Sequence, residues 1–311
     1  MRVAPPAPAA PLIFSHRAGS WDLRERARVV GILNLTPDSF YDGGRWSDPG
    51  RALDRARAMI DEGADALDLG AQSTRPGAGP AVGEAEEWDR LRRVLSDVVA
   101  LGVPVSVDTY RAGVARRALD QGAAIVNDVS GLTAEPEMAR VTAEAGAGLV
   151  LMHAEGAPDR MHAPVDYEDV AGAVRGFLER SMRAAVAAGI PEERIALDPG
   201  IGFSKRAPQS FEALRGLPRL TSLGRPLYIG VSRKSFLAHV TGRPTPLPAE
   251  DRLAAGLGAT IAALVLGGSI FRTHDVRETV DAIRTAEAIL KSAGSVDPRT
   301  EEPRVEEKAG A

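Results

Sequence analysis

Polar side chains that could bind a small molecule follow a series of short apolar runs in the sequence. Each run is rich in β-branched residues and ends close to an amide, a carboxylate, an imidazole or a cation. The residues are Asn34, Asp108, Asn127, Asp198, Lys234, Arg272 and His274. A single Asn or Asp after a strand is usually a turn former or a helix cap. Capping does not explain the lysine, arginine and histidine, so the set indicates a binding site.

The acidic and amide side chains suit a ligand that offers several N–H donors. Asp108, Asn127 and Asp198 follow apolar strands, where an unpaired charge is costly to bury. A heterocycle with an amidine-like edge meets that need, because a carboxylate accepts two parallel hydrogen bonds from it.

A second group of residues suits an anion and a metal ion. Arg272 and His274 stand two residues apart and, with Thr74 and Arg75 of "QSTRPG", have the composition of an oxyanion or phosphate clamp. Asn34 precedes "LTPDSFYDGG", a glycine-rich loop with neutral and acidic oxygens. Oxygen ligands favour Mg²⁺, and a phosphorylated substrate would fill its remaining positions.

A repeated strand-then-helix pattern must position these side chains. The apolar runs end at residues 34, 70, 108, 128, 153, 198, 232 and 274. Segments with helical spacing cover residues 50–62, 84–101, 112–121, 136–146, 166–189, 210–216, 251–267 and 276–290. This pattern predicts an α/β fold, a closed (β/α)₈ TIM barrel with its active site at the C-terminal ends of the strands. A doubly wound open sheet is the alternative, but "PGIGFSK" lacks the third glycine of a dinucleotide loop.

Composition limits the partners and the compartment. The 311 residues carry a net charge of −4, without the basic excess of a nucleic-acid binder. No cysteine is present, which removes disulfides and thiolate chemistry and fits a cytoplasmic protein. The longest apolar segment, "LAAGLGATIAALVLGG", is shorter than the ~20 residues of a membrane span. We expect a flexible leader over residues 1–25, one barrel domain over 26–291 and a disordered tail over 292–311.

Eight collinear segments carry a family resemblance. "GILNLTPDSFYDGG", "DLGAQSTRPGA", "SVDT", "IVNDVSG", "LMH", "LDPGIGF", "GVSRKS" and "FRTHDV" resemble, in order and spacing, the signature segments of the dihydropteroate synthase family. The resemblance implies a (β/α)₈ barrel and a transferase of folate biosynthesis. Such an enzyme joins 6-hydroxymethyl-7,8-dihydropterin diphosphate to 4-aminobenzoate, giving 7,8-dihydropteroate and diphosphate. It also implies a sulfonamide target and a homodimer formed through the last helices.

The resemblance further implies a role for each matching residue. The pterin diphosphate would contact Thr74, Asp108, Asn127, Asp198, Lys234, Arg272 and His274. The aminobenzoate would contact Asp42, Arg75, Pro76, Phe203 and Ser235. Asn34 would bind Mg²⁺. Asp108, Lys234, Arg272 and His274 would take part in catalysis, and two mobile loops, residues 36–44 and 72–83, would close over the second substrate.

Four residues depart from the family pattern, and two alternative functions remain. Tyr41, Ala71, Gln72 and Ser204 stand where many relatives have Ser, Gly, Glu and Gly. A pterin-binding methyltransferase that serves a corrinoid protein would share the Asp and Asn pocket but would not need the anion clamp. A catalytically silent pterin-binding homologue would be expected to lose Asn34 or the clamp. We expect His153 to be structural.

Overall fold

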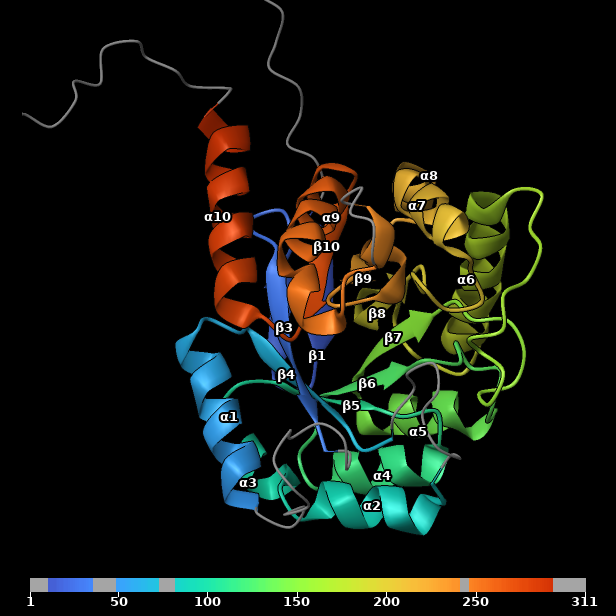
Figure 1. The fold of residues 1–311 in the computed structure, drawn as a ribbon. Helices are drawn as coiled ribbons and strands as arrows, with labels where there is room; N and C mark the ends of the chain where they lie inside the picture. The colour runs from blue at the N-terminus through green and yellow to red at the C-terminus, as the bar shows by residue number, and fades with distance from the viewer. Residues whose placement is uncertain (1–10, 36–48, 73–81, 241–245, 293–311) are drawn as a thin grey trace, which may run out of the picture.

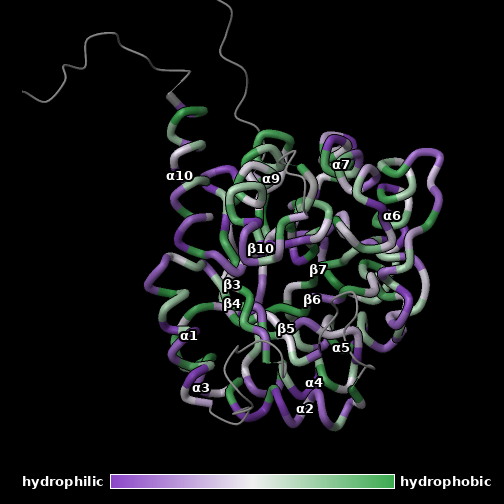
Figure 2. The backbone as a smooth tube through the Cα atoms, in the orientation of Figure 1, coloured by the Kyte–Doolittle hydropathy of each residue, from purple (hydrophilic) through white to green (hydrophobic). Residues whose placement is uncertain are grey.

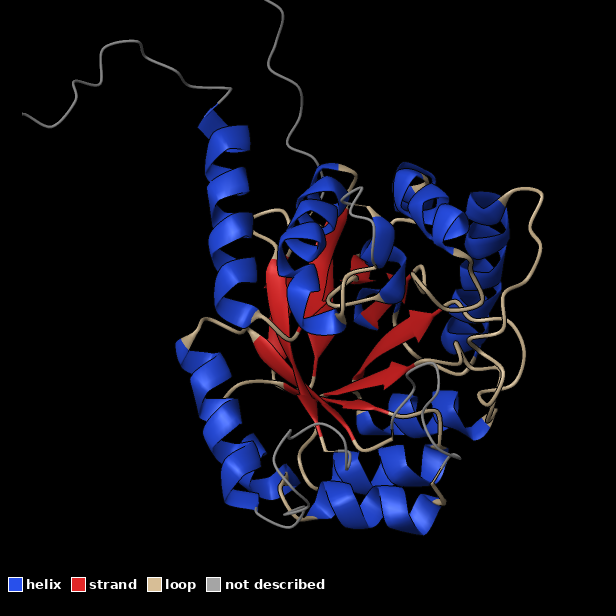
Figure 3. Ribbon diagram, viewed as in Figure 1, coloured by secondary structure: helices blue, strands red, loops and turns tan. Residues whose placement is uncertain are grey.

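The computed structural model describes residues 11–35, 49–72, 82–240 and 246–292. Eight parallel strands close into a barrel in the order β10-β3-β4-β5-β6-β7-β8-β9. They are β3 (Arg28–Asn34), β4 (Ala66–Gly70), β5 (Val105–Asp108), β6 (Ile125–Asp128), β7 (Gly148–Met152), β8 (Ile195–Asp198), β9 (Leu227–Gly230) and β10 (Gly268–Thr273). The strands lie at the centre with the helices around them (Figure 3). The predicted (β/α)₈ barrel is confirmed.

The helices follow the strands in the predicted order (Figure 1). They are α1 (Pro49–Asp61), α2 (Glu84–Arg92), α3 (Leu95–Val99), α4 (Ala112–Asp120), α5 (Glu137–Ala145), α6 (Val170–Ala187), α7 (Ala207–Arg215), α8 (Leu217–Thr221), α9 (Leu253–Val265) and α10 (Val276–Ser292). Short 3-10 helices cover Glu192–Arg194, Ser235–His239 and Ala249–Arg252. Among these helices, none is long and apolar enough to cross a membrane.

Three helix predictions differ from the structure, and one of them, over residues 210–216, begins earlier, at Ala207, and is followed by the unpredicted α8. The helix predicted over residues 84–101 divides into α2 and α3, because Val94 leaves the helical backbone at φ −130° and the chain turns to bury Leu95 and Val98. The helix predicted from residue 166 begins at Val170. Asp169 caps it there, since its side chain accepts a hydrogen bond from the Gly172 N–H.

The inward side chains change from apolar to polar along several strands of the barrel. In β6 the inward pair is Ile125 and then Asn127, and in β8 it is Ala196 and then Asp198. Residues two apart in a strand face the same side, so these two strands each place a polar side chain directly after an apolar one on the inner face. The opposite faces pack against the helices through leucine and valine. The interior of the barrel is therefore apolar toward the N-terminal ends of the strands and polar toward their C-terminal ends.

A hairpin closes the apolar end of the barrel. Strands β1 (Ile13–His16) and β2 (Gly19–Asp22) pair antiparallel. Their side chains Phe14 and Trp21 are buried against the inward apolar residues of the barrel strands. Gly148, at the start of β7, lies so close to Phe14 that a Cβ there would be 2.9 Å from the Phe14 ring. The flexible leader predicted over residues 1–25 is therefore wrong for the hairpin, because its alternating aromatic residues bury apolar surface. Residues 1–10 and the predicted tail beyond Ser292 lie outside the described residues.

Candidate active site

A cavity of about 390 Å³ is lined by residues from the polar end of the barrel. Every predicted site residue that the structure describes lines it: Asn34, Asp108, Asn127, Asp198, Phe203, Lys234, Ser235, Arg272 and His274. The predicted residues Asp42, Thr74, Arg75 and Pro76 lie outside the described residues, as do most of the two predicted loops. The structure thus brings together in one cavity side chains that lie up to 240 residues apart in the chain.

Arg272 forms ion pairs with two carboxylates on the inner side of the cavity. Its Nη2 donates to Asp108 Oδ2 at 2.8 Å, and its Nε donates to Asp68 Oδ2 at 2.6 Å. Burial raises the pKa of Asp108 to about 7, although Arg272 opposes this change. Burial disfavours the charged guanidinium, but Asp68 and Asp108 outweigh it and raise the pKa of Arg272. Arg272 of the predicted anion clamp is thus already paired with two carboxylates.

Asp198 and Asn127 present further acceptors to the cavity. Asp198 Oδ1 accepts a hydrogen bond from the Gly200 N–H at 2.7 Å, and burial raises the pKa of this carboxyl group. Asn127 Oδ1 is buried and has no hydrogen-bond partner among the described residues. Both residues line the cavity and are almost fully buried, so N–H donors of a ligand bound there would supply hydrogen bonds that water does not.

Lys234 and two aromatic rings form one wall. The Lys234 ammonium lies 4.5 Å from the centre of the Phe203 ring and donates to the Ile201 carbonyl oxygen. Burial lowers its pKa to about 8, although Asp198 opposes the change. His162 stacks on Phe203 with ring centres 4.8 Å apart. The lysine stem also needs Gly202, where a Cβ would lie 3.3 Å from Lys234 Cδ.

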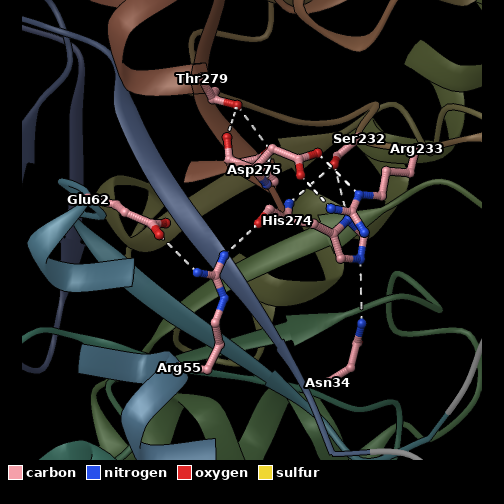
Figure 4. Close-up of polar contacts among 9 residues, drawn as sticks. Asn34, Arg55, Glu62, Ser232, Arg233, His274, Asp275 and Thr279 are labelled. Atoms are coloured by element: carbon pink, nitrogen blue, oxygen red, sulfur yellow. Dashed lines mark hydrogen bonds and ion pairs between the residues drawn. The ribbon is translucent and has the colours of Figure 1, made fainter. Parts of the chain in front are cut away.

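His274 makes four polar contacts with three residues at the rim of the cavity (Figure 4). Ser232 Oγ lies 3.0 Å from His274 Nδ1 and accepts from the His274 backbone N–H at 3.2 Å. Asn34 Nδ2 lies 3.4 Å from Nε2, and Arg55 of α1 donates to the His274 carbonyl oxygen at 3.0 Å. Arg55 is itself paired with Glu62 at 2.9 Å. The imidazole is therefore fixed before any ligand arrives.

Arg233, which sequence reasoning left without a role, joins the loops after β9 and β10. Its guanidinium pairs with Asp275, and its backbone has a positive φ of 58°. Thr279 Oγ1 donates to the Asp275 carbonyl oxygen at 2.7 Å (Figure 4). Arg233 stands between Ser232 and Lys234 in the chain, so its ion pair with Asp275 helps to hold the turn that carries both.

A buried lysine supports the loop after β8. Lys205 Nζ donates to the carbonyl oxygens of Gly200 and Phe203 at 3.0 and 3.1 Å, and lies 2.9 Å from His153 Nδ1. His153 is fully buried, in agreement with the structural role predicted for it. Ser204 has a positive φ of 51°, where many relatives have Gly. Its hydroxyl group compensates by accepting from the Glu155 N–H and donating to the Met161 carbonyl oxygen.

Gln72, another departure from the family pattern, contacts Arg111. Its Oε1 accepts from Arg111 Nη1 at 2.9 Å, and Arg111 also pairs with the buried Glu87. Arg111 Nη2 donates to the Val82 carbonyl oxygen at 2.7 Å. Gln72 and Glu87 thus share one partner, Arg111.

A metal ion would depend on few protein ligands here. Among the described residues, no group of three or more His, Cys, Asp or Glu side chains could hold one. Asn34 lines the cavity and carries one amide oxygen. This composition fits Mg²⁺, which often keeps waters and takes one or two protein oxygens together with substrate phosphates.

The model of the family described as pterin binding enzyme matches residues 30–274. The chain belongs to the pterin-binding enzyme family. The matched range begins in β3 and ends at His274, so it contains seven complete barrel strands, most of β3 and every cavity residue named above. Membership in the pterin-binding family agrees with the acceptors that the cavity presents.

This chain is similar to several dihydropteroate synthases over nearly its whole length. The dihydropteroate synthase of Synechocystis sp. is 42% identical over 289 residues, which cover 92% of this chain and 96% of that protein. A Xanthomonas albilineans dihydropteroate synthase solved with 4-aminobenzoic acid matches with a TM-score of 0.83 and 38% identity, covering 90% of this chain and 99% of that chain. A Burkholderia cenocepacia dihydropteroate synthase complexed with 7,8-dihydropteroate matches with a TM-score of 0.82 and 38% identity, covering 92% and 99%.

Proposed function

We propose that this chain is a dihydropteroate synthase, which makes 7,8-dihydropteroate from 6-hydroxymethyl-7,8-dihydropterin diphosphate and 4-aminobenzoate. The observation that carries the proposal is the convergence of Asp108, Asn127 and Asp198 in one cavity beside Lys234. A pterin offers these acceptors a row of N–H donors. The relatives named above, two of them solved with the second substrate or the product, support the same assignment.

The pterin would lie against the carboxylates and the amide. Asp198 and Asn127 accept hydrogen bonds from its pyrimidine edge, and Lys234 donates to its carbonyl group. Asp108 has a pKa of about 7 in the free protein because it is buried. N–H donors from the ligand favour its ionised form, so binding restores its charge.

The reaction would be a substitution at the pterin methylene group. The bond between the methylene carbon and the diphosphate oxygen breaks with both electrons leaving on the oxygen. The aminobenzoate nitrogen then forms the new C–N bond and releases one proton. Asp108 stabilises positive charge on the pterin, while Arg272 and His274 stabilise the leaving diphosphate. The protein supplies no nucleophile, in agreement with a chain that has no cysteine.

Mg²⁺ would be held by Asn34 and by the phosphates of the substrate. When bound, the ion neutralises charge on the diphosphate and makes it a better leaving group. The aminobenzoate would lie between Phe203 and Ser235, which line the same cavity. Sulfonamides would compete for this position; a Yersinia pestis dihydropteroate synthase was solved with a sulfonamide drug complex.

A homodimer would cover an apolar surface on α9. Ala254, Gly258, Ala262 and Val265 are exposed at helical spacing, and Val265 is 61% exposed. Figure 2 draws α9 mainly in white and green, unlike the purple of α2. Small residues allow a second helix to approach closely. Val265→Asp should convert the dimer to a monomer in sedimentation, whereas Val186→Asp, at an exposed valine of α6, should not; a monomeric wild-type chain would contradict this proposal.

A cytoplasmic location is part of the proposal, because a chain without cysteine loses no disulfide in a reducing compartment. The reaction itself is tested with the purified full chain, both substrates and Mg²⁺. We expect steady formation of 7,8-dihydropteroate that stops when a chelator removes the metal. No product at saturating Mg²⁺, or methyl transfer from methyltetrahydrofolate to a corrinoid protein instead, would contradict the proposal.

A further inference from the structure

Asp68 is a buried acid of the barrel interior that has no part in the reaction described above. It lies in the middle of β4, two residues before the strand ends, and its side chain is 0% exposed. It is absent from the cavity lining, so a ligand in the cavity would not touch it. A fully buried carboxylate is costly unless it is paired, so its partners indicate why it is there.

One oxygen of Asp68 accepts hydrogen bonds from two predicted pterin-site residues. Asp68 Oδ2 lies 2.6 Å from Arg272 Nε and 3.1 Å from Asn127 Nδ2. The other oxygen, Oδ1, is buried without a hydrogen-bond partner among the described residues. The carboxylate therefore acts on the site through a single acceptor atom.

The bond to Asn127 determines which end of that amide faces the ligand. The Asn127 NH₂ group donates to Asp68 Oδ2, the oxygen that also accepts from Arg272, so the amide nitrogen points toward Asp68. The amide oxygen of Asn127 is then left for the cavity, where it is buried and has no partner in the described part of the chain. An Asn side chain could otherwise present either a donor or an acceptor.

Arg272 forms two ion pairs, and only the one with Asp108 can be reached by a ligand, because Asp68 does not line the cavity. Arg272 Nη2 binds Asp108, which lines the cavity and is 14% exposed. A ligand that engages Asp108 competes with that bond but cannot reach the bond between Nε and Asp68. Asp68 can therefore hold Arg272 in place while Asp108 exchanges partners.

We propose that Asp68 is a positioning residue of the pterin site. It fixes Asn127 as an acceptor and keeps Arg272 anchored when the ligand binds. The inference rests on the proposed function, since it assumes that the ligand is a pterin with N–H donors. It adds a residue that does not contact the ligand but orients the Asn127 amide and holds Arg272 in position.

Substitutions at position 68 separate this role from a general contribution to folding. Asp68→Ala and the bulkier Asp68→Leu remove the acceptor, and we expect each to weaken binding of 6-hydroxymethylpterin at least about 30-fold in calorimetry. Asp68→Asn retains an oxygen at the Oδ2 position and should lose less than about 5-fold. The KM for 4-aminobenzoate should change little in all three. Ser106→Ala is the control, because Ser106 is buried in the neighbouring strand β5 and its Oγ has no partner among the described residues.

A spectroscopic measurement keeps the test independent of whether the variants fold. The whole chain contains only two asparagines, Asn34 and Asn127, so ¹⁵N-asparagine labelling gives two side-chain amide pairs. In the free wild-type protein the Asn127 NH₂ protons should exchange slowly with water, because they donate to the buried Asp68, and they should stay protected when 6-hydroxymethylpterin is added. Fast exchange of these protons in the free protein would mean that the amide does not donate to Asp68, which overturns the inference.

The outcomes distinguish this inference from the proposed function. A wild-type protein that binds no pterin overturns the proposed function and, with it, the role of Asp68. A wild-type protein that binds pterin, together with a folded Asp68→Ala variant that binds it equally well, overturns only the role of Asp68. Equal loss for the pterin and for the aminobenzoate would also overturn it, because that is the behaviour of a merely structural residue.

Discussion

The N-terminal hairpin makes the stability of the protein depend on pH through His16. His16 is 5% exposed and packs edge-on against Trp21, with ring centres 4.9 Å apart. Neither ring nitrogen has a hydrogen-bond partner among the described residues. Burial, with a smaller contribution from Arg194, lowers the pKa of His16 from 6.5 to about 4. We therefore expect His16→Phe to change the acid stability of the protein.

The direction and size of the effect follow from proton binding. The unfolded chain binds a proton at His16 below about pH 6.5, but the folded chain binds it only below about pH 4. Stability is therefore complete above the upper value and is lost as the pH falls toward the lower one. The full difference is about 3 kcal/mol, and most of it, about 2.5 kcal/mol, is lost by about pH 4.5. His16→Phe keeps an aromatic ring and removes this loss.

Urea unfolding at about pH 7 and about pH 4.5 measures the effect. The free energy of unfolding of the wild type should fall by about 2.5 kcal/mol more than that of His16→Phe between the two conditions. His153 is present in both proteins and cancels from the comparison. Ser20→Ala, at an exposed position of the same hairpin, should behave like the wild type. An identical pH dependence for His16→Phe would refute the reasoning, because it would mean that the hairpin is not docked.

Three further predictions concern the site. Asp198→Asn should weaken pterin binding about 10- to 100-fold, since a buried acceptor becomes a mismatched donor; wild-type affinity in calorimetry would count against the assignment. His274→Ala should raise the KM for the pterin diphosphate at least about 10-fold and leave the affinity for free hydroxymethylpterin nearly unchanged, so equal losses would move His274 away from the phosphates. Lys205→Met should raise the KM for the pterin diphosphate, because the three hydrogen bonds of Lys205 hold the loop between Asp198 and Phe203. Arg206→Met loses only a surface ion pair with Asp166 and should leave this KM unchanged. An equal effect of both variants would disprove a special role for Lys205.

Much of the site could be predicted because barrel strands place their C-terminal residues at one end. Asn34, Asp108 and Asp198 each end a strand, as the sequence pattern indicated. Their convergence follows from the parallel order of the strands and needs no knowledge of the loops. Pattern alone did not identify the ligand, because an acid at a strand end is compatible with many donors; the family resemblance supplied that step.

Residues away from the strand ends were missed for physical reasons. Asp68 stands two positions before the end of β4, whereas the prediction considered only residues at the C-terminal ends of the strands. The signal was present, since an acid in the middle of the otherwise apolar strand "ALDLG" has to be paired. His162 reaches the cavity from the long connection between β7 and α6, which has no periodicity that could place it.

The N-terminal hairpin was missed because the preceding Pro- and Ala-rich residues suggested an extended leader. The segments "IFSH" and "GSWD" are short, and each contains one large aromatic residue. Only the open, apolar end of the barrel gives Phe14 and Trp21 a surface on which to pack. A local pattern of this kind acquires its structure from the tertiary context and not from its own propensity.

The most direct test of the central claim is the stoichiometry of the two products. The purified chain is mixed with 6-hydroxymethyl-7,8-dihydropterin diphosphate, 4-aminobenzoate and Mg²⁺, and both products are measured over time by mass spectrometry. A dihydropteroate synthase releases one diphosphate for every 7,8-dihydropteroate, and Asp198→Asn should slow both to the same extent. Diphosphate released without dihydropteroate, or no turnover at all, would contradict the account.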